Sequence, residues 1–227
     1  MPRWTLSGGI RYDRPSSDNY SADMKNHVSK SYKLSFEITD KDTIFAGKND
    51  FYILPGLDKI YARWADPDDP DAGVQDHGNR DLKPAEGTTR SVGYTHKFNE
   101  ASAFTFNWFK TKNTRTIGYS YEEGHYVNYN FGLARGWNAQ FIHQLSKDWR
   151  FDIGWAHLYQ KVPGDNLAMG YYPKDKITFD LIYTHEKWQV GVDGFYFIRK
   201  KNPAYAAYKG WPHDKYGICL LYTSDAA

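Results

Sequence analysis

The chain has 227 residues, and 29 Lys and Arg against 27 Asp and Glu leave a formal net charge of +2. Aromatic residues make up 18% of the chain, yet its mean hydropathy is -0.74, so apolar side chains must be interleaved with polar ones. No stretch approaches the roughly 20 apolar residues of a transmembrane helix. The small charge excludes phosphate binding as the main role, so no nucleic-acid partner is expected. The single cysteine, Cys219, excludes a disulfide framework and a multi-cysteine zinc site.

Apolar and polar residues alternate with period two along most of the chain, which predicts β-strands. The predicted strands are Trp4–Tyr12, Tyr32–Ile38, Ile44–Phe51, Val92–Phe98, Phe104–Trp108, Tyr126–Leu145, Trp149–Tyr159, Ile177–Tyr183 and Trp188–Tyr196, followed by the start of a tenth. The clearest is Tyr126–Leu145, which we expect to be one strand of about 20 residues. Strands of soluble domains usually have about 5 or 6 residues. The length of this segment therefore favours a membrane-spanning wall.

The connections between these strands alternate in length. Short polar turns are expected at Thr39–Asp42, Asn99–Ala101, Ser146–Asp148 and His185–Lys187, and long links at Asp13–Ser29, Tyr52–Gly87, Asn113–Gly124, Lys161–Lys174 and from near Lys200. Outer-membrane barrels have this asymmetry, with short turns at one end and long loops at the other. We therefore predict an all-β, antiparallel up-and-down transmembrane β-barrel. A soluble carbohydrate-binding β-sandwich is the alternative for a β-rich chain.

The same alternation assigns the two faces of the wall. Aromatic residues beside the turns, Phe98, Trp149 and Trp188, suit the headgroup level of a membrane. Arg135 shares the apolar face, where a cation at the bilayer midplane costs about 2 to 4 kcal/mol. We therefore expect the lipid band of its strand at Trp137–Leu145, with Arg135 at the outer headgroups. The lumen should be lined by Asn128, Asn130, Asn138, Gln140, Gln144, Asp152, Thr178 and Asp180.

Three passages resemble TonB-dependent outer-membrane receptors. Residues 79–86 and the strand 91–98 resemble the family's "NPxLKPE … EIGY" passage, with Arg80 in place of the usual Pro and Ala85 inserted. Residues 126–138 resemble its "N-x-G-x-A-x-x-x-G-V-E" strand, with Trp137 and Asn138 replacing Val-Glu. Residues 4–13 are similar to "W-x-L-x-x-G-x-R-Y-D". The family-motif residues are Asn79, Leu82, Lys83, Pro84, Glu86, Gly132, Ala134 and Gly136.

The resemblance implies a barrel of about 22 strands that encloses an N-terminal plug. Residues 1–218 would be an internal part of that barrel, with about nine or ten strands, no plug and no signal peptide, located in a Gram-negative outer membrane. Residues 219–227 resemble the translation of a sequencing adapter and are expected to be a non-native tail. The implied partners are outer-membrane lipid, TonB acting through the plug, and a small metal chelate. We expect the chelate to be a ferric siderophore, with haem or cobalamin as alternatives. The resemblance also implies a monomeric receptor that is not an enzyme and has no cofactor.

Catalytic signatures are absent from the sequence, which contains no zinc-protease, nucleophile-elbow, P-loop or dinucleotide-binding motif. A small complete barrel acting as an adhesin or a hydrolase is the runner-up, and His125 with Asp165 is the one pair it offers. One acidic loop could bind Ca²⁺ through carboxylate oxygens, although its spacing fits no EF-hand and a solvated loop is favoured. Its carboxylates are Asp68, Asp69, Asp71 and Asp76.

Ligand capture in such receptors falls to the outer loops, so the long links should supply the contacts. Aromatic and Arg side chains suit planar anionic chelates, because they stack and form charge-assisted hydrogen bonds. The ligand-binding residues predicted on this basis are Arg14, Tyr61, Arg63, Trp64, His77, Arg115, Tyr119, Tyr121 and His125.

Overall fold

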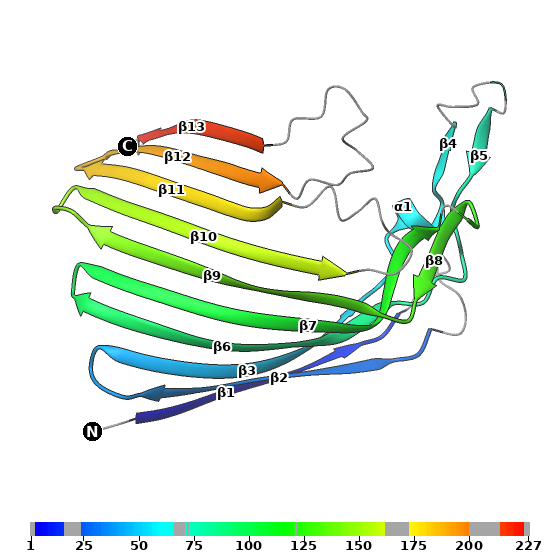
Figure 1. Cartoon of the computed structure of the whole chain (residues 1–227), viewed down its shortest axis with the longest axis horizontal. Helices are drawn as coiled ribbons and strands as arrows, with labels where there is room; N and C mark the ends of the chain where they lie inside the picture. The colour runs from blue at the N-terminus through cyan, green and yellow to red at the C-terminus, as the bar shows by residue number, and fades with distance from the viewer. Residues whose placement is uncertain are drawn as a thin grey trace.

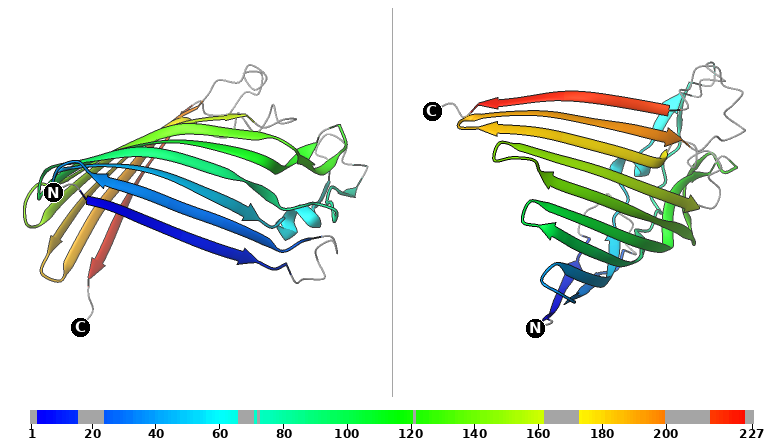
Figure 2. Two further views of the ribbon diagram at one scale, coloured as in Figure 1. Left: turned by 90° about the horizontal axis from the view of Figure 1, so that it is seen from below. Right: turned by 60° about the vertical axis from the view of Figure 1, so that its left-hand side comes forward.

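The computed structural model describes residues 3–15, 24–65, 71, 73–120, 122–161, 173–199 and 214–224. One antiparallel sheet dominates it (Figure 1). In spatial order its strands are β1 (Arg3–Asp13), β2 (His27–Glu37), β3 (Asp42–Ile53), β6 (Ala85–Asn99), β7 (Ser102–Ser120), β9 (Gly132–Gln144), β10 (Trp149–Lys161), β11 (Pro173–His185), β12 (Trp188–Arg199) and β13 (Asp214–Ser224). The sheet curves without closing, because β1 and β13 form opposite edges of the described strands (Figure 2). This is the predicted up-and-down wall.

The two ends of the wall differ as the sequence predicts. Short turns join β2 to β3, β6 to β7, β9 to β10 and β11 to β12 at one end. In the first of these, the Thr39 hydroxyl accepts hydrogen bonds from the backbone N–H groups of Lys41 and Asp42, at 3.1 and 3.0 Å. The other end carries α1 (Leu57–Ile60), β4 (Arg63–Ala65), β5 (Val74–Asp76) and β8 (His125–Tyr129) (Figure 1). We call it the loop end.

Each face of the sheet has its own chemistry. A hollow of about 630 Å³ marks the polar face as the concave one, and Ser31, Asn49 and Ser91 contribute to its lining. An amide pair bridges β7 and β9 on this face, where the Asn107 Nδ2 donates to Asn138 Oδ1 at 3.1 Å. The opposite face carries exposed apolar side chains on nearly every strand, among them Trp4, Ile10, Val92, Phe106, Trp155 and Phe179. An apolar face of this extent suits contact with lipid.

The hydrophobic core is small and lies at the loop end. In the described part of the chain, its buried apolar side chains include Tyr52, Pro55, Ile60, Ala62 and Leu82. They come from the end of β3, from α1 and the residues on either side of it, and from the segment before β6. Among the described residues, the long part of the sheet has no such core, and its apolar face is exposed.

The prediction of one strand over Tyr126–Leu145 is wrong. The structure divides it into β8 and β9, which both pair with β7, through Thr116–Ser120 and Ser102–Asn113 respectively. The continuous long strand is therefore β7, with 19 residues. It also occupies most of the predicted Asn113–Gly124 link. Alternation within one segment does not reveal that its two halves meet different stretches of the partner strand.

The predicted lumen residues share the polar face, with two exceptions. Asn138, Gln140, Gln144, Asp152, Thr178 and Asp180 occupy positions of one parity across β9, β10 and β11. Gln140 Nε2 donates to Asp152 Oδ2 at 2.7 Å. Asn128 and Asn130 do not line this wall, because β8 pairs with β7 away from the main strand order and Asn130 lies in the bend after it.

Candidate functional site at the loop end

The family-motif segment, residues 79–86, binds the β7–β8 hairpin to the sheet. Asn79 Nδ2 donates to the carbonyl oxygen of Tyr126 at 2.8 Å, and Asn79 Oδ1 accepts from the Asp81 backbone N–H at 2.8 Å. Lys83 exchanges two hydrogen bonds with the amide of Asn128, at 2.7 and 2.8 Å. Leu82 between these anchors is 1% exposed. The Asn79 side chain, the buried Leu82 and the Lys83 backbone thus position the loop end.

Four aromatic rings from four elements form a cluster beside this segment. Trp64 on β4 stacks on His77, after β5, at 4.0 Å between ring centroids and 14° between planes. Tyr119 on β7 and Tyr126 on β8 lie opposite each other in register, with centroids 5.5 Å apart. Trp64 contacts both, at 5.3 and 6.3 Å. We call this group the aromatic cluster. Trp64 is 37% exposed, so part of its ring is open to a ligand.

His77 is the polar centre of the cluster and is 7% exposed. Its Nδ1 lies 2.7 Å from the carbonyl oxygen of Gly124, which also accepts from the Tyr119 hydroxyl at 2.9 Å. A carbonyl only accepts, so this contact places the imidazole proton on Nδ1. Nε2 is then an acceptor, and it has no hydrogen-bond partner among the described residues. Gly124 has φ of +70°, a backbone conformation that glycine adopts without strain.

Tyr126 is a half-buried tyrosine of this group. Burial raises the pKa of its phenol, and the negative charge of Asp58 on α1 raises it further. The side chain therefore stays neutral to a higher pH than a solvated tyrosine. The aromatic cluster thus combines a partly open Trp64 ring with a neutral Tyr126 phenol.

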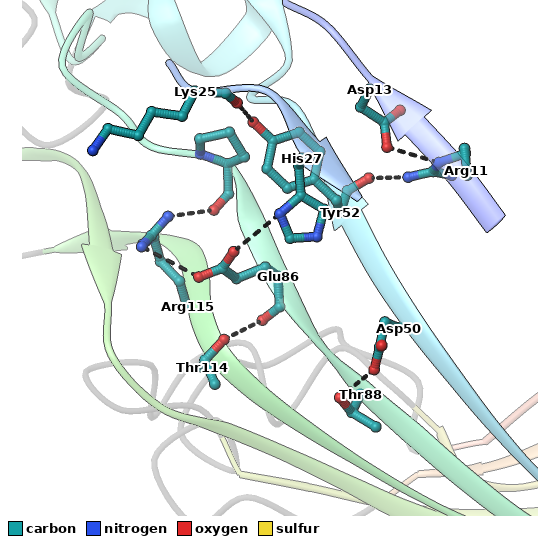
Figure 3. A network of polar contacts seen from close by, with 11 residues as sticks. Arg11, Asp13, Lys25, His27, Asp50, Tyr52, Glu86, Thr88, Thr114 and Arg115 are labelled. Carbon is teal, nitrogen blue, oxygen red and sulfur yellow. Dashed lines mark hydrogen bonds and ion pairs between the residues drawn. The ribbon is translucent and has the colours of Figure 1, made fainter. Parts of the chain in front are cut away.

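A second feature is a cavity of about 530 Å³ near the ends of β2, β3, β6 and β7. Its polar wall is an ion pair in which Arg115 Nη2 lies 3.3 Å from Glu86 Oε1 (Figure 3). Arg115 also donates to the carbonyl oxygen of Pro84 at 3.3 Å. His27 approaches Glu86 at 3.9 Å and stacks on Tyr52 at 4.3 Å. The cavity thus combines aromatic surface with a cation that is only about three-tenths exposed.

The structure brings some predicted ligand residues together and leaves others apart. Trp64, His77 and Tyr119 form the aromatic cluster, whereas Arg115 belongs to the cavity. Arg80 lies over the Tyr61 ring at 5.0 Å, and His125 Nε2 lies 3.5 Å from Glu123. Arg14 and Arg63 are exposed. Tyr121 lies outside the described residues.

The acidic loop gives no metal site in the described part of the chain, where no three His, Cys, Asp or Glu side chains are grouped closely enough to hold an ion. Asp71 and Asp76 are exposed, and Asp76 Oδ1 accepts the Gly78 backbone N–H at 2.9 Å. Asp68 and Asp69 lie outside the described residues, so their role in Ca²⁺ binding stays a prediction.

The other family-motif residues lie on β9 and act through their small size. A Cβ atom on Gly136 would overlap the carbonyl oxygen of His157 and lie 3.1 Å from the Phe109 ring. A Cβ on Gly132 would lie 2.8 Å from the Asn113 amide. Ala134, between them, pairs with Thr111 of β7. Small residues therefore let β9 approach its neighbours closely.

Several residues of the loop end do not emerge from the sequence as site residues. From the sequence, Tyr126 and Asn128 are predicted to be strand residues. His27 and Tyr52 lie near the ends of two predicted long links, Asp13–Ser29 and Tyr52–Gly87. The hydrogen-bond partners of Tyr52, Tyr126 and Asn128 lie 27 to 47 positions away in the chain. The one available signal was the family-motif segment itself, whose Asn79 and Lys83 are the partners of Tyr126 and Asn128.

Comparison with known proteins agrees with this architecture. A family model described as TonB dependent receptor-like, beta-barrel, matches residues 1–218. The chain belongs to this family, whose members are receptors and transporters. Comparison with curated proteins gives no match. No helix in the described part of the chain is long and apolar enough to cross a membrane.

Solved structures show the same fold at low sequence identity. The siderophore receptor PiuA from Acinetobacter baumannii aligns with a TM-score of 0.62 and 17% identity, over 99% of this chain and 35% of that one. The siderophore receptor PirA from Pseudomonas aeruginosa aligns with a TM-score of 0.59 and 14% identity, over 96% and 38%. The copper transporter OprC aligns with a TM-score of 0.56 and 19% identity, over 85% and 31%. The chain thus spans less than two fifths of the length of these structures.

The predicted non-native tail, residues 219–227, lies outside the family match, but part of it is a strand in the structure. The family match ends at residue 218, whereas β13 continues through Cys219 to Ser224 and pairs with β12. The proposal that residues 219–227 are non-native stays a prediction.

Proposed function

We propose that this chain is part of the barrel wall of an outer-membrane receptor that imports a scarce nutrient with energy supplied by TonB. The two unpaired sheet edges and the coverage of 31 to 38% of the related structures support a place within a longer barrel. Outer-membrane lipid would contact the apolar face, and TonB would act through a plug supplied by the rest of that protein. One dominant curved sheet and the family match both favour a barrel wall over the soluble sandwich.

The ligand we propose is a ferric siderophore, and the observation that carries this choice is the aromatic cluster at the loop end. The partly open Trp64 ring of this cluster and the Arg115 guanidinium of the cavity offer stacking and charge to an anionic metal chelate. Two related structures are siderophore receptors. Haem and cobalamin, whose macrocycles are flat, are the alternatives. The polar concave face would line the passage, and transport would involve no covalent step.

Uptake of radioactive iron as a ferric siderophore tests the proposal in cells that express the complete parent gene. Import should require TonB, and Trp64→Ala should weaken ligand binding about tenfold, since loss of stacking adds to loss of buried area. Trp188→Ala, an exposed tryptophan at the turn end, is the matched control and should bind normally. Import that persists without TonB would contradict the proposal.

Arg115 is tested separately. Arg115→Ala should also lower the affinity for the ferric siderophore, because a cation of the cavity is lost. Unchanged affinity would remove Arg115 from the site and leave it a structural partner of Glu86.

A further inference from the structure

One buried hydrogen-bond acceptor in the aromatic cluster has no partner in the described part of the chain. It is Nε2 of His77, whose other ring nitrogen, Nδ1, is fixed as a donor by the Gly124 carbonyl oxygen at 2.7 Å. The imidazole is 7% exposed, so solvent does not satisfy this nitrogen. A buried acceptor without a partner is costly, and a donor brought by a ligand would remove that cost.

The backbone of His77 is held on both sides. Its N–H donates to the Ala62 carbonyl oxygen at 2.8 Å, and its carbonyl oxygen accepts from the Tyr126 N–H at 3.1 Å. The next residue, Gly78, lies so close to the backbone of Ile60 that a Cβ atom there would overlap it. Because the backbone and Nδ1 are both bonded, the direction of the Nε2 lone pair is set before a ligand arrives, as in a preorganised binding site.

Trp64, which covers one face of this imidazole, is held less firmly. It lies on β4, which forms a separate two-stranded sheet with β5, and a sheet of this size is marginally stable by itself. Its ring stacks on His77 at 4.0 Å and is still partly exposed. A ligand that displaces Trp64 from this face would therefore meet an acceptor that keeps its place.

We propose that His77 Nε2 accepts a hydrogen bond from an N–H or O–H group of the bound chelate, so that His77 selects chelates with such a donor beside their metal-binding groups. The inference rests on the proposed function and narrows its ligand class. A donor on the edge of a flat ring can reach Nε2 while the ring contacts Trp64. The edge of haem carries hydrocarbon groups and carboxylates, which accept hydrogen bonds when ionised, so haem would leave Nε2 without a donor.

The test uses the receptor produced from the complete parent gene and two uncharged iron chelates that differ in a single group. Iron(III) tris(benzohydroxamate) has an N–H on each ligand, and in iron(III) tris(N-methylbenzohydroxamate) a methyl group replaces it. Isothermal titration calorimetry should show that the wild type binds the N–H chelate about tenfold more tightly, because the methylated chelate leaves a buried acceptor unpaired.

Two variants separate this hydrogen bond from the structural role of the imidazole. His77→Asn keeps an amide donor near the position of Nδ1 but has no acceptor as far out as Nε2, so the preference for the N–H chelate should disappear. His77→Gln carries an amide oxygen that reaches the position of Nε2, so most of the preference should return. His185→Phe, at the turn end, is the control and should keep the wild-type preference. A general loosening of the loop end would weaken binding of both chelates and leave their ratio unchanged.

The inference is overturned if the wild type binds the N–H chelate no better than its methylated analogue, or if the preference survives in His77→Asn. A shift of the haem Soret band that depends on His77 would also overturn it, because Nε2 would then bind iron instead of accepting a hydrogen bond. Iron uptake distinguishes failure of the proposed function. TonB-dependent import of ferric siderophore without discrimination between the chelates overturns the inference alone, whereas discrimination without such import overturns only the proposed function.

Discussion

The Asn128 amide and the Lys83 backbone form a closed pair of hydrogen bonds across 45 positions of the chain. The Lys83 N–H donates to Asn128 Oδ1 at 2.7 Å, and Asn128 Nδ2 donates to the Lys83 carbonyl oxygen at 2.8 Å. An asparagine side chain carries one donor group and one acceptor, so it matches an extended backbone as a neighbouring strand would. The pair holds β8, and with it the aromatic cluster, against the family-motif segment.

Replacing Asn128 by Ala should loosen this attachment. Both hydrogen bonds are lost, and at about 0.5 to 1.5 kcal/mol each the expected cost is about 1 to 3 kcal/mol of local stability. Amide hydrogen exchange at Lys83 and Leu82 should accelerate accordingly. Asn130→Ala, two positions further at an exposed bend, is the control and should leave exchange unchanged. Equal protection in both variants would show that Leu82 burial alone holds the segment.

Gly136→Ala should destabilise the wall through a steric effect. The added methyl group would overlap the His157 carbonyl oxygen, so β9 and β10 must separate, and overpacking of this kind costs about 1 to 3 kcal/mol. Gly191→Ala is the matched control, because its nearest neighbour there is the Ile182 side chain at 3.9 Å. The apparent unfolding temperature in detergent should fall for Gly136→Ala alone. A similar fall in both variants would point to backbone propensity instead.

The sheet could be predicted from the sequence because its two faces differ in residue type. Residues such as Trp137 and Asn138 reveal the face by parity alone, and the short turns separate one strand from the next. The pairing of β8 and β9 with separate stretches of β7 could not be found this way. It depends on partners distant in sequence, which alternation does not identify.

For the loop end, the sequence predicts which kinds of residue form the site but not how they contact one another. Aromatic and Arg residues in long links pointed to Trp64, His77 and Tyr119, which do meet. The Asn128–Lys83 pair, and the Gly124 carbonyl that holds His77, involve backbone groups that carry no sequence signature. The geometry of such contacts follows from the fold rather than from composition.

Arg115 and Glu86 should be coupled energetically, as a double-mutant cycle can measure. Their side chains are 28% and 27% exposed, so the pair is partly shielded from solvent and a coupling of about 1 kcal/mol is expected. Arg115→Ala should cost more than Glu86→Gln, because Arg115 also donates to the Pro84 carbonyl oxygen. Unfolding in urea of the two single variants and the double variant gives the coupling. Additive effects would mean that the ion pair contributes nothing beyond its separate contacts.

The raised pKa of Tyr126 predicts how the loop end responds to alkaline pH. A folded-state pKa above the ordinary value of about 10 means that the native protein binds this proton more tightly than the unfolded chain does. The corresponding contribution to stability is complete below about pH 10 and is lost as the pH rises through the folded-state pKa. Tyr126→Phe lacks the phenol, so its stability should fall less steeply between about pH 9 and 11 than that of the wild type.

Asp58→Asn provides the internal comparison for this prediction. Asp58 is the second cause of the raised pKa, after burial, so its neutralisation should reduce the steepness only in part. Urea unfolding followed at several pH values for the wild type and both variants gives the three slopes. The expected order is wild type steepest, then Asp58→Asn, then Tyr126→Phe. Identical slopes for wild type and Tyr126→Phe would show that the Tyr126 hydroxyl is solvated and that the aromatic cluster is open at β8.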